Sequence, residues 1–133
     1  MSANLQPAPD SVRILGVRVD DVTLPEAVER LAALAASGQP HQVTTVNPEF
    51  IMCARRRPDF AAVLEQSTLA LPDGAGLMLA ARWLGRPLRG RAPGVDVILA
   101  LAPRAAEMGL SLFLLGGADG VAEEAAAQLL RAA

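Results

Sequence analysis

Three polar segments of the sequence each follow an apolar run that is typical of a β-strand. They are Thr45 with Asn47, Asp73, and the glycine-rich turn at 116–120. The carboxyl ends of parallel strands meet at one edge of a sheet, and α/β proteins bind their ligands beyond that edge. The sequence therefore predicts that Thr45, Asn47, Asp73 and Gly117 surround a single cleft.

Asp73 is the residue best suited to acid–base chemistry. A carboxylate at a strand end, next to Gly74 where a ligand can approach closely, can act as a general base. The alternative is that Asp73 caps a helix that starts at residue 75, a position that suits aspartate. His41 is the only histidine, and it precedes its strand, so a carboxylate is the better candidate base.

The other two segments are open to the same pair of interpretations. Asn47 can bind a sugar hydroxyl or a carbonyl group, or it can cap the helix that follows it. Gly116, Gly117 and Gly120 can present backbone N–H groups to a phosphate, or they can simply form a tight turn between a strand and a helix. The turn matches neither the dinucleotide fingerprint nor the P-loop.

Four arginines crowd the end of one predicted helix and the loop after it. They are Arg82, Arg86, Arg89 and Arg91. Guanidinium groups can neutralise a diphosphate leaving group through paired hydrogen bonds. The alternative is an exposed basic face with no ligand.

Composition narrows the class of protein. The chain has 133 residues, of which 52% are hydrophobic and 20% charged, as expected for one globular domain. The net charge of −2 argues against a nucleic-acid-binding protein. The single cysteine, Cys53, excludes an intrachain disulfide and fits a cytoplasmic protein. With one histidine and no Asp-x-Asp motif, we expect no bound metal, and nothing in the sequence calls for a cofactor.

The sequence also bears on contact with a membrane. The first residues lack the charged and apolar regions of a signal peptide. No apolar run reaches the ~20 residues that span a bilayer. We therefore expect any membrane contact to be peripheral, at the inner face of the cell membrane.

Apolar periodicity and turn residues predict the order of the elements. We expect a flexible tail at 1–11 and one α/β domain at 12–133, with these elements in order: a strand or hairpin at 12–19, a helix from Thr23 to Ser37, a strand at 42–46, helices from Pro48 and from Pro58, a strand at 68–71, helices at 75–84 and 95–108, a buried strand at 110–115, and a helix from Val121. This alternation predicts a Rossmann-like, mainly parallel sheet flanked by helices.

The last predicted helix carries no stop signal, and we expect the chain to be the N-terminal portion of a longer enzyme. The apolar run at 110–115 and the final helix then lack partners. An exposed apolar face of that size commonly becomes an interface, so we expect a homo-oligomer.

Four motifs, taken together, resemble the WecG/TagA/CpsF family of bacterial glycosyltransferases. They are Thr-x-Asn ending at Asn47, Pro-Asp-Gly around Asp73, Arg-x-x-Gly-x-Asp from Arg91 to Asp96, and Leu-Gly-Gly ending at Gly117. They occur in the family's order, and the resemblance runs from about Ile14 to the last residue. It implies transfer of N-acetylmannosamine, its uronate or a related sugar from a UDP donor to a polyprenyl-diphosphate-linked sugar, in cell-surface polysaccharide synthesis. The implied reaction inverts the anomeric centre and needs no metal.

The resemblance also implies roles for individual residues. Asp73 would be the general base that deprotonates the acceptor hydroxyl, and Thr45 and Asn47 would line the same pocket. Arg91 and Asp96, from the Arg-x-x-Gly-x-Asp motif, would lie near the substrate.

The glycine turn, with Gly116, Gly117 and Gly120, would serve the nucleotide. Family members are longer, and their C-terminal part completes the pocket and helps to reach the membrane.

Two other functions remain open. One is a nucleotide- or dinucleotide-binding domain without transferase activity, although no glycine-rich turn follows the first strand as that fold requires. The other is an inactive or regulatory fragment.

Overall fold

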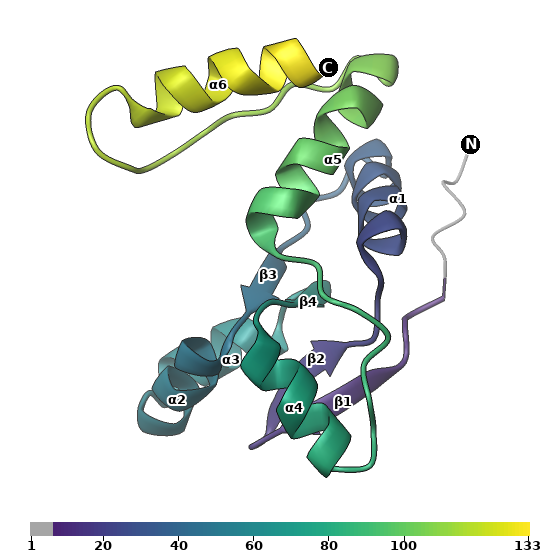
Figure 1. The fold of residues 1–133 in the computed structure, drawn as a ribbon, viewed down its shortest axis with the longest axis vertical. Helices are drawn as coiled ribbons and strands as arrows, with labels where there is room; N and C mark the ends of the chain where they lie inside the picture. Colours follow the sequence, from purple (N-terminus) through teal and green to yellow (C-terminus); the bar gives the residue numbers. More distant parts are fainter. Residues whose placement is uncertain (1–6) are drawn as a thin grey trace.

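A computed structural model describes residues 7–133, in which the strands lie in the N-terminal half of the chain, with helices between and after them (Figure 1). In chain order the elements are β1 Ser11–Ile14, β2 Val17–Asp20, α1 Leu24–Ala36, β3 Val43–Val46, α2 Pro48–Arg56, α3 Pro58–Glu65, β4 Leu69–Pro72, α4 Ala75–Trp83, α5 Gly94–Glu107 and α6 Val121–Ala132. The predicted tail at 1–11 lies in part outside the described residues, and Ser11 already belongs to β1.

β1 and β2 form an antiparallel hairpin, with Val12 opposite Val19. Only Leu15 and Gly16 connect them, and both have positive φ, 48° and 85°. A two-residue turn of this kind matches the twist of a hairpin. Parallel neighbours would need a crossover of a dozen or more residues, so the first two strands had to be antiparallel.

α1 begins with a capping box formed by Thr23 and Glu26. The N–H of Glu26 donates to the Thr23 hydroxyl at 3.5 Å, and the N–H of Thr23 donates to the Glu26 carboxylate at 3.0 Å. Pro25 lies in the first turn, where its missing N–H costs nothing. These reciprocal bonds set the direction in which the helix leaves β2.

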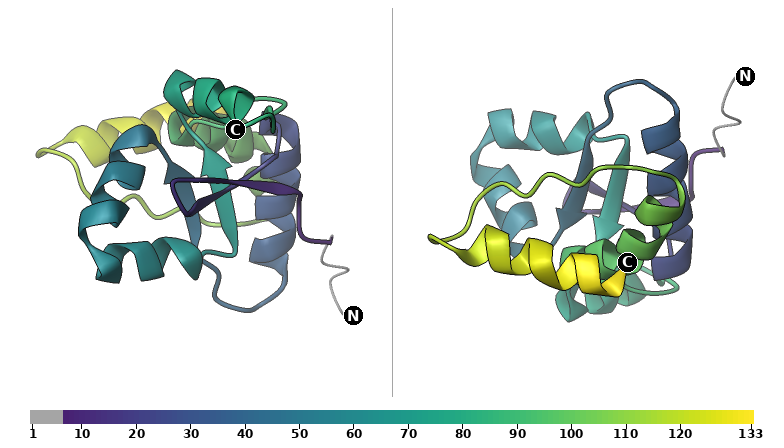
Figure 2. Two further views of the ribbon diagram at one scale, coloured as in Figure 1. Left: turned by 90° about the horizontal axis from the view of Figure 1, so that it is seen from below. Right: turned by 90° about the horizontal axis from the view of Figure 1, so that it is seen from above.

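β3 and β4 form a parallel pair whose two faces are covered by different helices. Leu69 and Leu71 of β4 pack in one apolar cluster with residues of α1 and α5. Ala70, which points the other way, packs in a second cluster with the hairpin and with residues of α2, α3 and α4. Figure 2 shows the strands between α1 on one side and α2 with α3 on the other. β4 is buried throughout.

The hairpin joins β4 through a side chain. The Asp20 carboxylate, 2% exposed, accepts a hydrogen bond from the N–H of Ala70 at 2.8 Å. Burial raises the pKa of Asp20, while the Arg18 guanidinium lies 3.5 Å from its other oxygen. Arg18 also donates to the carbonyl of Ser67. Asp20 thus accepts the hydrogen bond of the Ala70 N–H, a role that the backbone of a neighbouring strand would otherwise fill.

The described residues do not by themselves establish a Rossmann-like, mainly parallel sheet, which stays a prediction. They contain one antiparallel pair and one parallel pair, so the mixed α/β class is confirmed in its coarse form.

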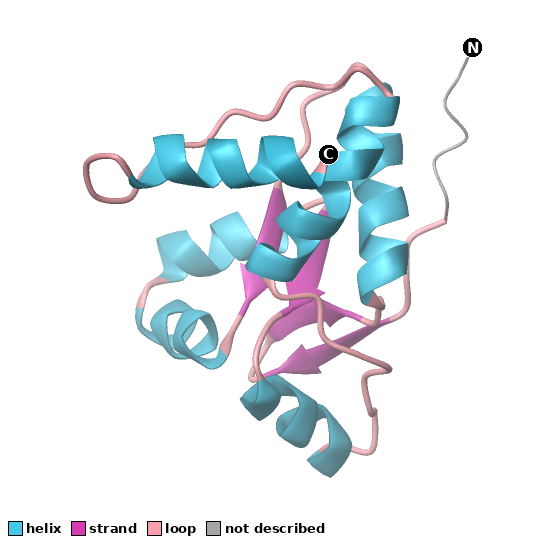
Figure 3. Cartoon of the chain, turned by 45° about the horizontal axis from the view of Figure 1, so that its top comes forward, coloured by secondary structure: helices cyan, strands magenta, loops and turns pink. Residues whose placement is uncertain are grey.

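The prediction of a buried strand at 110–115 is wrong. Those residues form a loop between α5 and α6 (Figure 3), with Phe113 88% and Leu115 91% exposed. The apolar run was sound evidence of strand propensity. A strand also requires a neighbour to pair with its backbone, and this segment has none among residues 7–133.

No helix within residues 7–133 combines the length and the apolar character needed to cross a bilayer.

Candidate functional site

The carboxyl ends of β3 and β4 bring three of the candidate residues to one edge. Thr45 lies opposite Leu71 in the parallel register. One step further on, the N–H of Asp73 donates to the carbonyl of Val46 at 2.8 Å. This bond holds the backbone of Asp73 beside the residue that precedes Asn47. Thr45, Asn47 and Asp73 therefore share the edge at which α/β folds bind ligands.

Asn47 caps α2 with its side-chain oxygen. That oxygen accepts the N–H of Phe50 at 2.9 Å, from an extended backbone with φ −126° and ψ 171°. The capping interpretation is thus confirmed for the oxygen. The side-chain NH2 group of Asn47 makes no hydrogen bond within residues 7–133, so two donors remain for a ligand.

Asp73 does not cap α4. The cap position belongs to Gly74, which has φ 108° and makes no side-chain capping bond. The capping interpretation of Asp73 is therefore wrong. Its half-buried carboxylate makes neither a hydrogen bond nor an ion pair in the described part of the chain. Among the carboxylates near this edge, Glu49 and Asp96 are exposed, whereas Asp73 is half-buried.

Glycines let three helix starts come close around this edge. A Cβ on Gly76 would lie 3.0 Å from Cγ of Pro48, which joins the start of α4 to the start of α2. A Cβ on Gly94 would lie 3.2 Å from Cγ2 of Thr45, which places the start of α5 on β3. Neither α4 nor α5 has a side-chain cap. Their free N–H groups and positive dipole ends favour an anion.

The four arginines lie at the end of α4 and in the loop between α4 and α5. Two of them are bonded to other parts of the chain. Arg89 is bonded to Asp21 and Glu26, and Arg86 donates to the carbonyl of Ser11 at 3.2 Å. These two guanidinium groups are engaged in holding the fold.

Arg82 and Arg91 are exposed and form no hydrogen bond or ion pair through their side chains in the described part of the chain. Arg91 immediately precedes Ala92, whose N–H donates to the carbonyl of Pro72 at 2.8 Å. Asp96 is exposed in the first turn of α5. Arg91 thus neighbours a residue that is bonded to Pro72, the residue before Asp73. Asp96 lies on α5, the helix whose start packs on Thr45.

The glycine turn is placed elsewhere. Gly116, Gly117 and Gly120 have φ of 106°, 87° and 82°, values that suit glycine, and Gly120 caps α6 in the left-handed conformation. The turn lies in the segment beyond the far end of α5 (Figure 1). The structure does not bring it to the edge with Asp73, because its predicted position depended on a strand at 110–115.

Sequence reasoning missed two residues that shape this edge. Gly94 lay inside a recognised motif, yet its role in the approach to Thr45 is visible only in three dimensions. Asp21 follows β2, and no motif in the sequence singles it out. Its pairing with Arg89 spans 68 positions, and no local pattern signals such a contact.

Comparison with known proteins identifies the family of the chain. The model of the glycosyl transferase WecG/TagA/CpsF family matches residues 12–133. An N-acetylglucosaminyldiphosphoundecaprenol N-acetyl-beta-D-mannosaminyltransferase of Staphylococcus aureus (strain NCTC 8325 / PS 47) is 29% identical over 116 residues, which is 86% of this chain and 46% of that protein.

A Bacillus spizizenii protein of the same name is 33% identical over 82 residues, which is 62% of this chain and 32% of that protein. The chain thus spans less than half the length of these relatives. Because the family model covers the whole α/β region, the chain belongs to the glycosyl transferase WecG/TagA/CpsF family.

Proposed function

We propose that this chain supplies the catalytic edge of a glycosyltransferase. The enzyme moves N-acetylmannosamine, or a related sugar, from a UDP donor to a polyprenyl-diphosphate-linked sugar in cell-surface polysaccharide synthesis. Family membership supports the reaction class, and the names of the relatives support the transferred sugar and the acceptor. The observation that carries the proposal is the uncommitted carboxylate of Asp73 at the edge formed by β3 and β4.

The proposed chemistry is a single displacement. The acceptor hydroxyl has a pKa far above neutral, so it needs a base as it attacks the anomeric carbon. The Asp73 carboxylate accepts that proton while the new C–O bond forms. The bond from the anomeric carbon to the diphosphate oxygen breaks, and UDP leaves with the bonding electrons. Attack from the face opposite the leaving group inverts the anomeric centre.

The leaving diphosphate needs positive charge. We propose that Arg91 and the uncapped starts of α4 and α5 provide it, in place of a cation held by an Asp-x-Asp motif. We propose that the NH2 group of Asn47 and the hydroxyl of Thr45 donate to sugar or phosphate oxygens, and that Asp96 accepts from a sugar hydroxyl. A nucleotide-binding role for Gly116, Gly117 and Gly120 stays a prediction.

Because the proposed acceptor carries a lipid, we propose that the enzyme works at the inner face of the cell membrane as a peripheral cytoplasmic protein. We also propose that copies associate through the exposed apolar residues of the α5–α6 segment, such as Phe113 and Leu115. Light scattering at high protein concentration tests this, and a clean monomer would contradict it.

The decisive experiment is turnover of UDP-N-acetylmannosamine by Asp73→Asn. We expect kcat to fall by roughly 10²–10⁴-fold, the usual contribution of a general base, with UDP affinity unchanged within a few-fold. The matched control is Asp59→Asn, which removes an exposed carboxylate paired with Arg57 at the start of α3. The wild-type activity should survive a chelator. Near-normal turnover by Asp73→Asn, or strict dependence on Mg²⁺, would overturn the proposal.

A further inference from the structure

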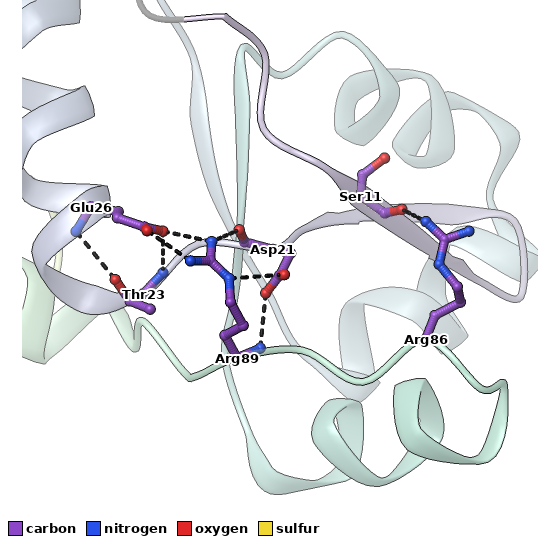
Figure 4. Close-up of polar contacts among 6 residues, drawn as sticks. All are labelled: Ser11, Asp21, Thr23, Glu26, Arg86 and Arg89. Atoms are coloured by element: carbon purple, nitrogen blue, oxygen red, sulfur yellow. Dashed lines mark hydrogen bonds and ion pairs between the residues drawn. The ribbon is translucent and has the colours of Figure 1, made fainter.

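We propose that Arg89 is a positioning residue for this site, acting through Arg91 and the start of α5. Arg89 lies in the loop between α4 and α5, and its side chain reaches back to the end of β2 and the start of α1 (Figure 4). The contact between Arg91 and a diphosphate rests on the proposed function. The positioning itself rests on the contacts described below and is tested separately.

Arg89 makes five hydrogen bonds with two acidic residues. Its backbone N–H and its Nε donate to the Asp21 carboxylate at 2.8 and 3.0 Å, and Nη2 donates to the Asp21 carbonyl at 2.7 Å. Nη1 and Nη2 donate to the two Glu26 oxygens, each at 2.8 Å. The planar guanidinium therefore has one allowed orientation, a constraint that lysine could not reproduce.

The hydrogen bonds of Arg89 join the loop between α4 and α5 to the end of β2 and to the start of α1. Glu26 also accepts the N–H of Thr23 in the α1 capping box, and hydrogen bonds from Arg89 hold the pKa of Glu26 at about 2. The same bonds raise the pKa of Arg89. Two carboxylates surround one guanidinium, so Arg89 has no spare charge for a diphosphate. Its position in the arginine cluster is therefore explained by the fold and not by direct ligand binding.

From Arg89 the backbone runs to the candidate site in a few residues. Gly90 passes close to Thr23, where a Cβ would lie 3.9 Å from the Thr23 Cα. Ala92 is fully buried and bonds to Pro72, the residue before Asp73. Arg91 lies between these anchors with an exposed side chain. Its backbone is therefore held by Arg89 on one side and by Ala92 on the other.

Stability alone does not account for such a network. The Arg89 side chain is 53% exposed, and exposed ion pairs contribute little to folding, commonly 0–1 kcal/mol. The same contacts can still hold a loop in one place, because several bonds of defined geometry act on a short segment. We expect loss of Arg89 to leave the fold intact and to loosen residues 90–94.

Hydrogen exchange of backbone amides tests the positioning without any ligand. In Arg89→Met we expect the Ala92 amide to exchange roughly tenfold faster, since local opening governs its protection. The Leu84 amide, bonded to Ala80 at the end of α4, should be unaffected. Arg86→Met is the matched control, because Arg86 lies in the same loop and makes one side-chain bond to a backbone carbonyl. Unchanged exchange at Ala92 in Arg89→Met would overturn the inference.

A double-mutant cycle tests whether Arg89 acts through Arg91. UDP affinity is measured by calorimetry for Arg89→Met, Arg91→Met and the double variant. We expect roughly tenfold weaker binding in each single variant and little further loss in the double variant, since coupled residues are non-additive. Arg89→Lys should not restore affinity, because lysine lacks the fork. Additive losses would refute action through Arg91. If the wild type binds no UDP, the proposed function fails, while exchange at Ala92 still decides the positioning.

Discussion

Alanine substitutions at Asn47 and Asp73 should have opposite consequences for stability and for activity. Both residues follow a strand and precede a helix, and local sequence suggests a cap for both. The structure assigns the cap to Asn47, whose oxygen lies 2.9 Å from the N–H of Phe50. It assigns none to Asp73, because Gly74 occupies the cap position of α4.

The magnitudes follow from the bonds that each change removes. Asn47→Ala loses one capping hydrogen bond, which costs about 1 kcal/mol of unfolding free energy. Asp73→Ala loses no hydrogen bond, so the packing part of its effect stays within about 0.5 kcal/mol. Its charge lies near the positive end of α4, which adds a few tenths of a kcal/mol that salt screens.

Urea unfolding followed by circular dichroism, at low and at high NaCl, separates these contributions. Asn47→Ala should lower the free energy of unfolding by about 1 kcal/mol at both salt concentrations, as should Thr23→Ala, which removes the α1 cap. Asp73→Ala should approach the wild type at high salt. A loss of about 1 kcal/mol for Asp73→Ala at high salt would show that its carboxylate caps α4 after all. The proposed base would then be engaged in the fold and the reasoning refuted.

Two further predictions concern the acidic residues around the hairpin. Asp20→Ala should cost about 2 kcal/mol, because it leaves the buried N–H of Ala70 without an acceptor; Asp20→Asn, which keeps an acceptor oxygen, should cost less in the same urea experiment. The folded-state pKa of Glu26 is lowered to about 2 from 4.5, so its stabilising effect is present above pH 4.5 and is lost as the pH falls toward 2. Glu26→Gln should flatten the dependence of the melting temperature on pH in that window, and an unchanged profile would contradict the ion pair with Arg89.

Short-range features of this fold follow from the sequence. The two-residue link through Gly16 predicts a hairpin because no longer path is available to the chain. The threonine and glutamate of the α1 capping box are three positions apart, so their bonds close within one turn of helix. The strands that end before Asn47 and Asp73 are bounded by prolines and polar residues. Each of these signals depends on neighbours within a few positions, and each is seen in the structure.

The tertiary structure alone decided which of these polar residues remain free. Asn47 and Asp73 look alike in sequence, but Gly74 takes the cap position of α4, and the Asp73 carboxylate has no bonding partner within residues 7–133. Arg89 resembles Arg91 in sequence, yet partners 63 and 68 positions away bind it. The segment at 110–115 has the composition of a strand and lacks a neighbouring strand among residues 7–133. Hydrogen-bond partners distant in the chain are chosen by packing, and packing depends on every element at once.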